Sequence, residues 1–433
     1  MEYLAKLMQE FDIYHQDWRL LYKYAVDNYV AYYTTPEDYE AKQSPGLKRK
    51  VMYWLTFVLW VGQMIKYSML TLYDIIYQDD KLIVMFGEYE GIYVTNRKLF
   101  GAMIAICAGC LIITKSIIYL LETRFMRGFC RLLLNMVKSE AFFRLSPRNQ
   151  TKLMVQANLL YYLYLKLTFY PLFLYGWIVL ASLAFMTYFT SHYEFNLAII
   201  IINGLVFTPI FIMNWMSLIS AGMVFGYLSL MFLSYKLDDI IHEIRINAIW
   251  HDRSKIIFMI GQYNQYVSII RDISLEMNLI VGSIIILTPY LFTMFIETIR
   301  QEQGDIFKII IALVCFAAFT QLLIINAFCA SITTRNQSIS KYLYPVLINR
   351  NKRQVIGFTQ IIKQFELINS NVKISSFIEQ LDEQFVGFSC FNLFEFTKLT
   401  FYEYLFAIFS TYCLSVDLIS DEYIHNLVHK HVN

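Results

Sequence analysis

The chain has 433 residues, of which 57% are hydrophobic and only 16% carry a charge, and its formal net charge is +2. Soluble proteins have about a quarter of their residues charged, so this composition, with a mean hydropathy of +0.46, excludes an ordinary soluble domain. The charges gather in patches between long apolar runs, which indicates a polytopic membrane protein.

Seven apolar runs are long enough to cross a bilayer as helices, since about 20 residues suffice. The predicted fold class is therefore an all-α membrane protein with seven transmembrane helices. The fourth run is longer than a bilayer requires, and we expect it to continue as a helix into the cytoplasm. The predicted spans are residues 51–74, 99–122, 166–190, 197–234, 274–297, 309–333 and 395–419.

Basic residues are divided unequally between the segments that connect these spans. Of the 36 Lys and Arg residues, 26 fall before residue 51 and in the connections 123–165, 235–271 and 334–385, whereas six fall in the alternate set. Because short cytoplasmic loops carry the excess of Lys and Arg, we expect the N-terminus inside the cell and the C-terminus outside. This orientation is opposite to that of a G-protein-coupled receptor.

No sequence pattern points to enzymatic chemistry. None of the seven histidines lies in a predicted span, and the chain contains no G-x-x-x-x-G-K-[ST], H-E-x-x-H or G-x-S-x-G sequence. We therefore expect no enzyme, no cofactor, no metal site and no nucleic-acid partner. His425 and His429 in the tail are spaced for one side of a helix and could bind zinc, but a plain polar tail is the simpler interpretation because so few ligands are present.

The segment before the last span mixes charge with an apolar stripe at helical spacing. This pattern predicts an amphipathic cytoplasmic helix that buries the stripe against neighbouring helices or another subunit. The stripe consists of Ile361, Ile362, Phe365 and Ile368.

The last span carries acidic residues near both ends. As a helix, Glu395 to Asp417 would cover about 33 Å, roughly one hydrocarbon thickness. A narrow stripe of polar and small residues falls within an arc of about 80°, and bulky residues occupy the opposite side. The stripe contains Glu403, Ala407, Ser410, Leu414 and Asp417, and the opposite side contains Phe401, Leu405, Ile408, Tyr412 and Ile419.

Such a stripe predicts a helix that lines a cation pore, in which several copies of the chain contribute one helix each and form rings of carboxylates. Leu414 and Leu418 would then form an apolar constriction that closes by dewetting. The alternative is that Asp417 simply lies at the headgroup boundary, where water reaches it.

The end of this span resembles the insect gustatory receptors, in the superfamily that also holds the odorant receptors. Their signature is T-Y, five mostly apolar residues, then Q-F, and this chain has Thr411 and Tyr412, five residues, then Leu418 and Ile419. The stretch "VGFSCFNLFEFTKLTFYEYLFAIFSTY" is similar to the glycine-phenylalanine segment that precedes that signature. Leu418 and Ile419 depart from the family's Gln and Phe.

The resemblance implies a homotetrameric, ligand-gated, non-selective cation channel in the plasma membrane, opened by a small-molecule tastant. Monovalent and divalent cations would permeate a central pore lined by the last span, and assembly with related subunits stays open. The gate would comprise Leu414 and Leu418, joined by Ile419 only if the helix end unwinds or rotates. The implied parts are a cytoplasmic segment at 1–50, a ligand-binding region at 51–333 with extensions at 123–165 and 235–273, an anchor region at 334–394, a pore helix at 395–419 and an extracellular tail at 420–433.

The resemblance also places a ligand pocket in the outer half of the membrane, among the second to sixth spans. Each candidate for this pocket could equally be a helix-packing residue, and a sugar, a bitter compound or a non-chemical stimulus all remain open. The candidates are Trp177, Tyr188, Asn203, Thr208, Thr288, Tyr290, Glu297 and Gln321.

Two other classes of protein compete with a channel. A metabotropic seven-span receptor would signal without a pore and would need its C-terminus inside the cell. A transporter or scaffolding protein would show no ring of pore-facing acids.

Replacing Asp417 by Asn is expected to lower cation conductance or divalent block, because it removes the proposed outer ring of charge. Patch-clamp recording of the variant beside the unmodified chain tests this expectation. Unchanged permeation would return Asp417 to the headgroup boundary.

Overall fold

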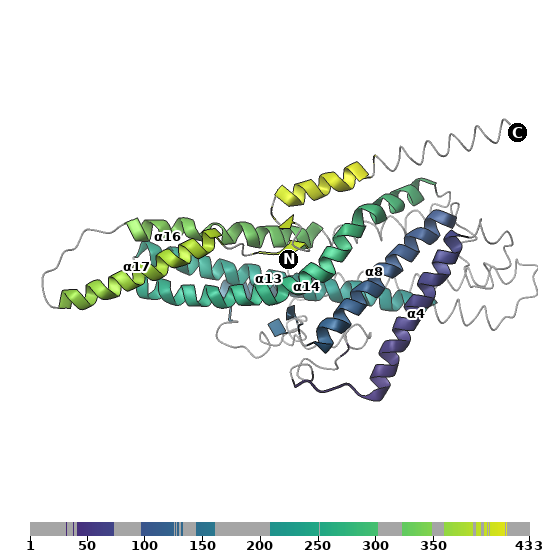
Figure 1. Ribbon diagram of the computed structural model, residues 1–433, viewed down its shortest axis with the longest axis horizontal. Coiled ribbons are helices and arrows are strands. Elements are labelled where there is room, and N and C mark those ends of the chain that lie inside the picture. The colour runs from purple at the N-terminus through teal and green to yellow at the C-terminus, as the bar shows by residue number, and fades with distance from the viewer. Residues whose placement is uncertain are drawn as a thin grey trace, which may run out of the picture.

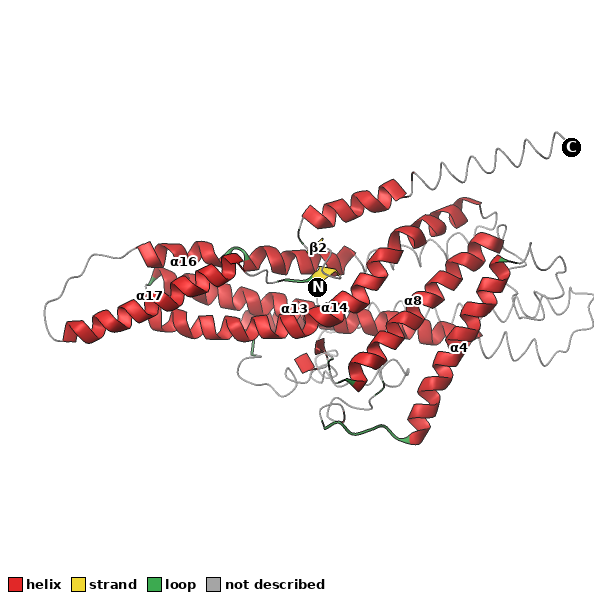
Figure 2. Cartoon of the chain, in the orientation of Figure 1, coloured by secondary structure: helices red, strands yellow, loops and turns green. Residues whose placement is uncertain are grey.

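The computed structural model describes most of the chain in separate stretches and is helical over nearly all of them (Figures 1 and 2). Side chains of 208–225 and of most residues in 281–290 lie outside the description. The described stretches are 41–72, 97–124, 144–160, 208–250, 252–301, 323–348, 359–383, 387–390, 394–395 and 399–411, with a few single or paired residues beside them.

The structure confirms a largely helical architecture, and the only strands in the described stretches form one two-residue antiparallel pair. Helical residues also cover 323–336 and 399–411. The labelled elements are α4 (Leu47–Thr71), α8 (Arg97–Thr123), α10 (Pro147–Leu160), α13 (Thr208–Ile249), α14 (Arg253–Gln301), α16 (Ile339–Ile348), α17 (Thr359–Glu383), β1 (Ser389–Cys390) and β2 (Phe394–Glu395).

α13 and α14 are the longest elements, with 42 and 49 residues. At 1.5 Å per residue each is longer than about 60 Å, roughly twice the hydrocarbon thickness. The expectation that the fourth span continues unbroken beyond residue 234 is therefore confirmed as a helix. The third predicted span lies outside the described residues, and so does the first half of the sixth.

Among the described residues, one helix, Gly101–Thr123, is long and apolar enough to cross a membrane by length and composition, with a mean hydropathy of 2.2. A second observation concerns its partner α4, whose surface is apolar and whose packed side includes polar side chains. Thr56, Gln63 and Lys66 are buried on α4, while large apolar side chains face outward. Soluble helices show the reverse distribution, so this arrangement supports a lipid-facing helix pair. The outward side chains are Leu47, Val51, Trp54, Leu55, Val58 and Ile65.

α4 and α8 pack closely around a buried lysine. The Lys115 ammonium donates to the Thr56 hydroxyl at 2.5 Å and lies over the rings of Tyr53 and Trp60, 4.5 and 4.9 Å from their centroids. Aromatic faces stabilise a desolvated cation, so Lys115 joins the two helices through these groups. At the other end of the pair, Gly101 allows close approach, because an added Cβ would lie 2.9 Å from the Tyr67 carbonyl oxygen.

The main hydrophobic core lies in a bundle formed by α13, α14, α16, α17 and residues 323–336 (Figure 1). α17 confirms the predicted helix, and of the predicted stripe only the side chain of Ile368 is described, since those of 359–366 lie outside the description. Ile368 is 58% exposed, whereas Ile374, Phe377 and Ile378 are buried in the core. The sequence carries apolar residues on two faces of α17, and the one that packs within this chain is the more C-terminal one.

The segment after α8 is tied to α14 by a glycine contact and a buried carboxylate. A Cβ added to Gly128 would lie 2.6 Å from the Asp272 carbonyl oxygen. Next to it, the Phe129 N–H donates to Glu276 Oε2 at 3.0 Å, and Glu276 is fully buried. Because the atoms in contact belong to the α14 backbone and not to a flexible side chain, they cannot rotate away, and only glycine fits at position 128.

Gly128→Ala is expected to destabilise the protein by about 1–3 kcal/mol, because α14 must shift to admit the methyl group. Gly62→Ala is the matched control, since a Cβ there meets nothing within 4 Å and alanine is favoured in helices by about 1 kcal/mol. Thermal unfolding of the purified variants in detergent compares them. Equal melting temperatures for the two variants would contradict the close contact.

Candidate functional site

The last described helix is joined to the bundle through a short hairpin. β1 and β2 pair antiparallel, with Ser389 opposite Glu395 and Cys390 opposite Phe394. Phe388, immediately before β1, is fully buried in the core of the bundle, and β1 packs against α14. The hairpin therefore fixes the start of the last helix to the bundle.

The last helix is described from residue 399 onward and does not begin at Glu395, which lies in β2. Thr397 and Thr400 explain the later start, because they bond to each other reciprocally. The Thr400 N–H donates to Thr397 Oγ1 at 3.2 Å, and the Thr397 N–H donates to Thr400 Oγ1 at 2.8 Å. This is the geometry of a capping box with threonine in the second position. The predicted span was too long by four residues, and the T-x-x-T spacing was the signal that could have shown it.

Residues 399–411 present three different faces. One face packs on the protein: Ile408 is 3% exposed, and Phe401 and Leu405 are half-buried. Glu403 and Ala407, from the predicted pore stripe, are exposed on another face, with Ser410 half-buried beside them. The third face is apolar and exposed, with Phe406 at 72%, and consists of Leu399, Tyr402, Phe406 and Phe409.

The rest of the predicted pore and gate is only partly described. The Thr411 hydroxyl donates to the Ala407 carbonyl oxygen at 2.8 Å, a bond along its own helix. Tyr412, Leu414, Asp417, Leu418 and Ile419 lie outside the described residues. Their roles as motif, pore lining and gate remain predictions.

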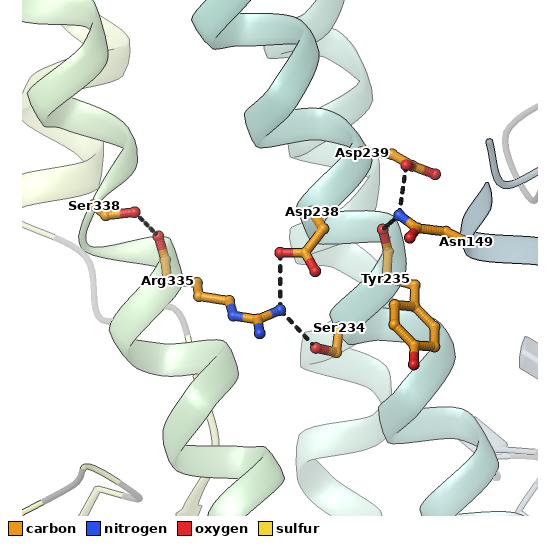
Figure 3. Close-up of polar contacts among 7 residues, drawn as sticks. All are labelled: Asn149, Ser234, Tyr235, Asp238, Asp239, Arg335 and Ser338. Carbon is orange, nitrogen blue, oxygen red and sulfur yellow. Dashed lines mark hydrogen bonds and ion pairs between the residues drawn. The ribbon is translucent and has the colours of Figure 1, made fainter. Parts of the chain in front are cut away.

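Arg335 connects the helix at 323–336 to α13 in the middle of the bundle (Figure 3). Its Nη1 atom donates to Asp238 Oδ1 at 2.8 Å and to Ser234 Oγ at 2.9 Å. Ser338 closes the turn behind it by donating its hydroxyl to the Arg335 carbonyl oxygen at 2.7 Å. The sequence reasoning did not single out these residues, because an Arg and an Asp about a hundred positions apart give no local signal.

Two tyrosines on α14 lie beside this ion pair. The Tyr263 hydroxyl donates to Asn336 Oδ1 at 3.2 Å, and its ring meets Phe377 of α17 edge-on, with centroids 5.2 Å apart. Tyr266 is fully buried one turn further along α14. Burial raises the pKa of both phenols, so both stay protonated. The cluster thus joins α13, α14, α17 and the end of the predicted sixth span.

Asp239, the neighbour of Asp238, joins α13 to α10 (Figure 3). Its carboxylate accepts from the Ser146 N–H at 2.8 Å, from the Ser146 hydroxyl at 2.7 Å and from the Asn149 amide at 2.7 Å. The Tyr235 hydroxyl adds a bond to Gln156 Oε1 at 2.5 Å. The N-terminus of α10 therefore lies against a carboxylate from another helix. That negative charge stabilises the positive end of the α10 dipole.

The predicted ligand pocket is described at few positions. Glu297 is fully buried on α14 and accepts from Arg300 at 2.8 Å, an ion pair within one turn of helix. Thr208 begins α13, and Thr288 and Tyr290 lie within α14, with side chains outside the description. The described residues contain no group of His, Cys, Asp and Glu arranged to hold a metal ion. The pocket remains a prediction; the candidates outside the described residues are Trp177, Tyr188, Asn203 and Gln321.

Comparison with solved structures identifies the fold. The insect olfactory receptor OR5 from Machilis hrabei matches with a TM-score of 0.58 and 7% sequence identity, over 86% of this chain and 90% of that one. The same receptor in complex with eugenol matches with a TM-score of 0.57, at the same identity and coverage. No protein-family model matches the chain, and no curated protein matches it in sequence.

The chain thus has the fold of an insect olfactory receptor. The resemblance to the gustatory and odorant receptor superfamily, which rested on about 35 residues of motif, is confirmed at the level of fold across most of the chain. These similar structures are receptors and not enzymes.

Removing either partner of the Arg335–Asp238 pair is expected to destabilise the bundle, with a coupling energy of about 0.5–1 kcal/mol in a double-mutant cycle of Arg335→Ala and Asp238→Ala. The value is modest because both side chains are about 40% exposed. The control is the Lys255–Asp252 pair at the start of α14, three residues apart and 3.4 Å between charged atoms, in which the lysine is 69% exposed and for which we expect coupling near zero. Denaturant unfolding measures both cycles, and equal coupling in the two would contradict a specific role for Arg335.

Proposed function

We propose that this chain is a subunit of a ligand-gated, non-selective cation channel that acts as a gustatory-type chemosensory receptor in the plasma membrane. The carrying observation is the olfactory-receptor fold over 86% of the chain. The eugenol complex of the neighbour supports a small molecule as the activating ligand here. The ligand would bind in the outer half of the membrane, where Glu297 and the other predicted pocket residues belong.

The three faces of residues 399–411 support a pore-lining role for the last helix. Glu403 and Ala407 are exposed in the single chain, although the helix is anchored at its start and packed along one side by Ile408. A polar and small face left open beside an apolar one suits a helix that borders water on one side and protein or lipid on the other. Glu403 would form a carboxylate ring near the inner end of the pore.

Four copies around one axis would close such a pore, since identical subunits assemble with cyclic symmetry. Two exposed apolar surfaces of the single chain support such an assembly. One is the apolar face of the last helix, and the other is the outer side of α17, where Ile368 and Val372 are exposed. Copies that meet at these surfaces would bury large apolar side chains.

The cytoplasmic bundle supplies a route from ligand site to pore. α13, α14 and the helix at 323–336 run from the predicted membrane region into the bundle, where Arg335 and Tyr263 join them to each other and to α17. α17 leads to the hairpin, and the hairpin leads to the capped start of the last helix. A tilt of the ligand-binding helices would therefore move the pore helix through direct contacts.

Cysteine accessibility tests the pore face directly. In a Cys413→Ser background, which removes an exposed native thiol, Ala407→Cys is expected to react with a cationic, membrane-impermeant methanethiosulfonate. The added charge should cut the cation current by about half or more, because it lies in the conduction path. Ile408→Cys is the matched control one position along and should be unaffected, since its side chain is buried. Currents are recorded during application of sugars, bitter compounds and eugenol.

Two results would count against the proposal. Equal sensitivity of the two cysteine variants would remove the last helix from the pore. A chain that reaches the cell surface and signals to these compounds without carrying current would favour a receptor without a pore.

A further inference from the structure

The junction between α10 and α13 contains a serine whose surroundings suit covalent modification. Ser146 follows Arg144 and Leu145 and precedes Pro147, the first residue of α10. Arg144, Pro147 and Arg148 are exposed, and residues 144–146 are not helical. A residue before proline is held in an extended conformation, which is the conformation that a protein kinase binds in its substrate cleft.

The hydroxyl of Ser146 carries part of the contact between two elements. It donates to Asp239 Oδ1 at 2.7 Å, while the Ser146 N–H donates to Oδ2 of the same carboxylate at 2.8 Å. These bonds, with that of Asn149, hold the start of α10 on α13. α10 precedes the predicted third span in the chain, so a change at Ser146 would act next to the predicted ligand-binding region.

We propose that Ser146 is a phosphorylation site for a proline-directed serine/threonine kinase, and that the phosphate releases α10 from α13. The kinase transfers the γ-phosphoryl group of a nucleoside triphosphate to Ser146 Oγ. The bond from the γ-phosphorus to its bridging oxygen breaks, the serine proton passes to the kinase base, and a nucleoside diphosphate leaves. The site rests on the cytoplasmic location predicted for 123–165, not on the proposed channel.

The charges around Ser146 determine how the phosphate would affect the contact between α10 and α13. The hydroxyl donor is lost, and a phosphate with a charge near −2 faces the carboxylate that held it, so the two repel. Basic groups also lie near the serine. Lys236 is buried on α13 and donates to the Arg144 carbonyl oxygen at 3.3 Å, and Arg144 and Arg148 are exposed. The phosphate would move away from Asp239 and toward the exposed Arg144 and Arg148.

The test uses the full chain purified in detergent, with magnesium ATP and a proline-directed kinase. In a Thr35→Ala, Ser44→Ala background, which removes the two other hydroxyls that precede proline in the segments predicted to be cytoplasmic, intact mass and peptide mapping should find one phosphate per chain on Ser146, absent when Ser146→Ala is added. Thr151→Ala is the matched control, because Thr151 is an exposed hydroxyl of α10 that bonds only to the Pro147 carbonyl oxygen of its own helix at 2.9 Å. It should still take up one phosphate.

Hydrogen exchange then measures the release of α10. In the phosphorylated chain, exchange across 144–153 should be at least about tenfold faster, since hydrogen bonds to a charged group are lost, and phosphatase treatment should reverse the change. In Asp239→Asn, phosphorylation should add little further, because the repelling carboxylate is absent. A lack of phosphate at Ser146, or phosphate there with unchanged exchange, would overturn the proposal.

Discussion

A helix satisfies its own backbone hydrogen bonds whether it lies in lipid or in water, and the arrangement of this chain depends on that property of α13 and α14. Because each is about twice as long as the hydrocarbon is thick, one continuous rod can belong to two environments. The bundle around their inner halves is built from ordinary core residues, while α4 and α8 show apolar outer faces and polar contacts within. No hinge is needed between the two regions, so movement in one is transmitted to the other as a tilt.

Two adjacent carboxylates on α13 bind different neighbouring segments of the bundle. Asp238 points to Arg335 from the predicted sixth span, and Asp239 points to Ser146 and Asn149 of α10, which leads to the third. Successive helical residues differ by about 100° in direction, so neighbours in sequence serve different partners. α13 therefore contacts both the start of α10 and the end of the helix at 323–336, and partly exposed ion pairs fix the register of such contacts more than they add stability.

The sequence predicted these features unequally, and particular residues show why. The length of α13 and the helix at α17 followed from apolar composition and periodicity, which act locally. The start of the last helix did not, because Thr397 and Thr400 cap it and Glu395 pairs in a strand. The face of α17 that packs within this chain, with Ile374 and Phe377, was not singled out, because Ile368 and Ile374 are equally apolar and only tertiary packing distinguishes them. Arg335, Asp238 and Tyr263 were missed altogether, since their contacts join positions far apart in the chain.

The unpacked side of residues 399–411 has a consequence for how such a protein is made. A lone copy with Glu403 facing hydrocarbon would carry a cost of about 2.5–3.5 kcal/mol for that charge, and one exposed to the cytosol would offer Tyr402, Phe406 and Phe409 to chaperones. Assembly with further copies would remove both problems at once. In the proposed assembly, surfaces of this kind would give the quality control of the endoplasmic reticulum a physical means to distinguish single copies from complete assemblies before export.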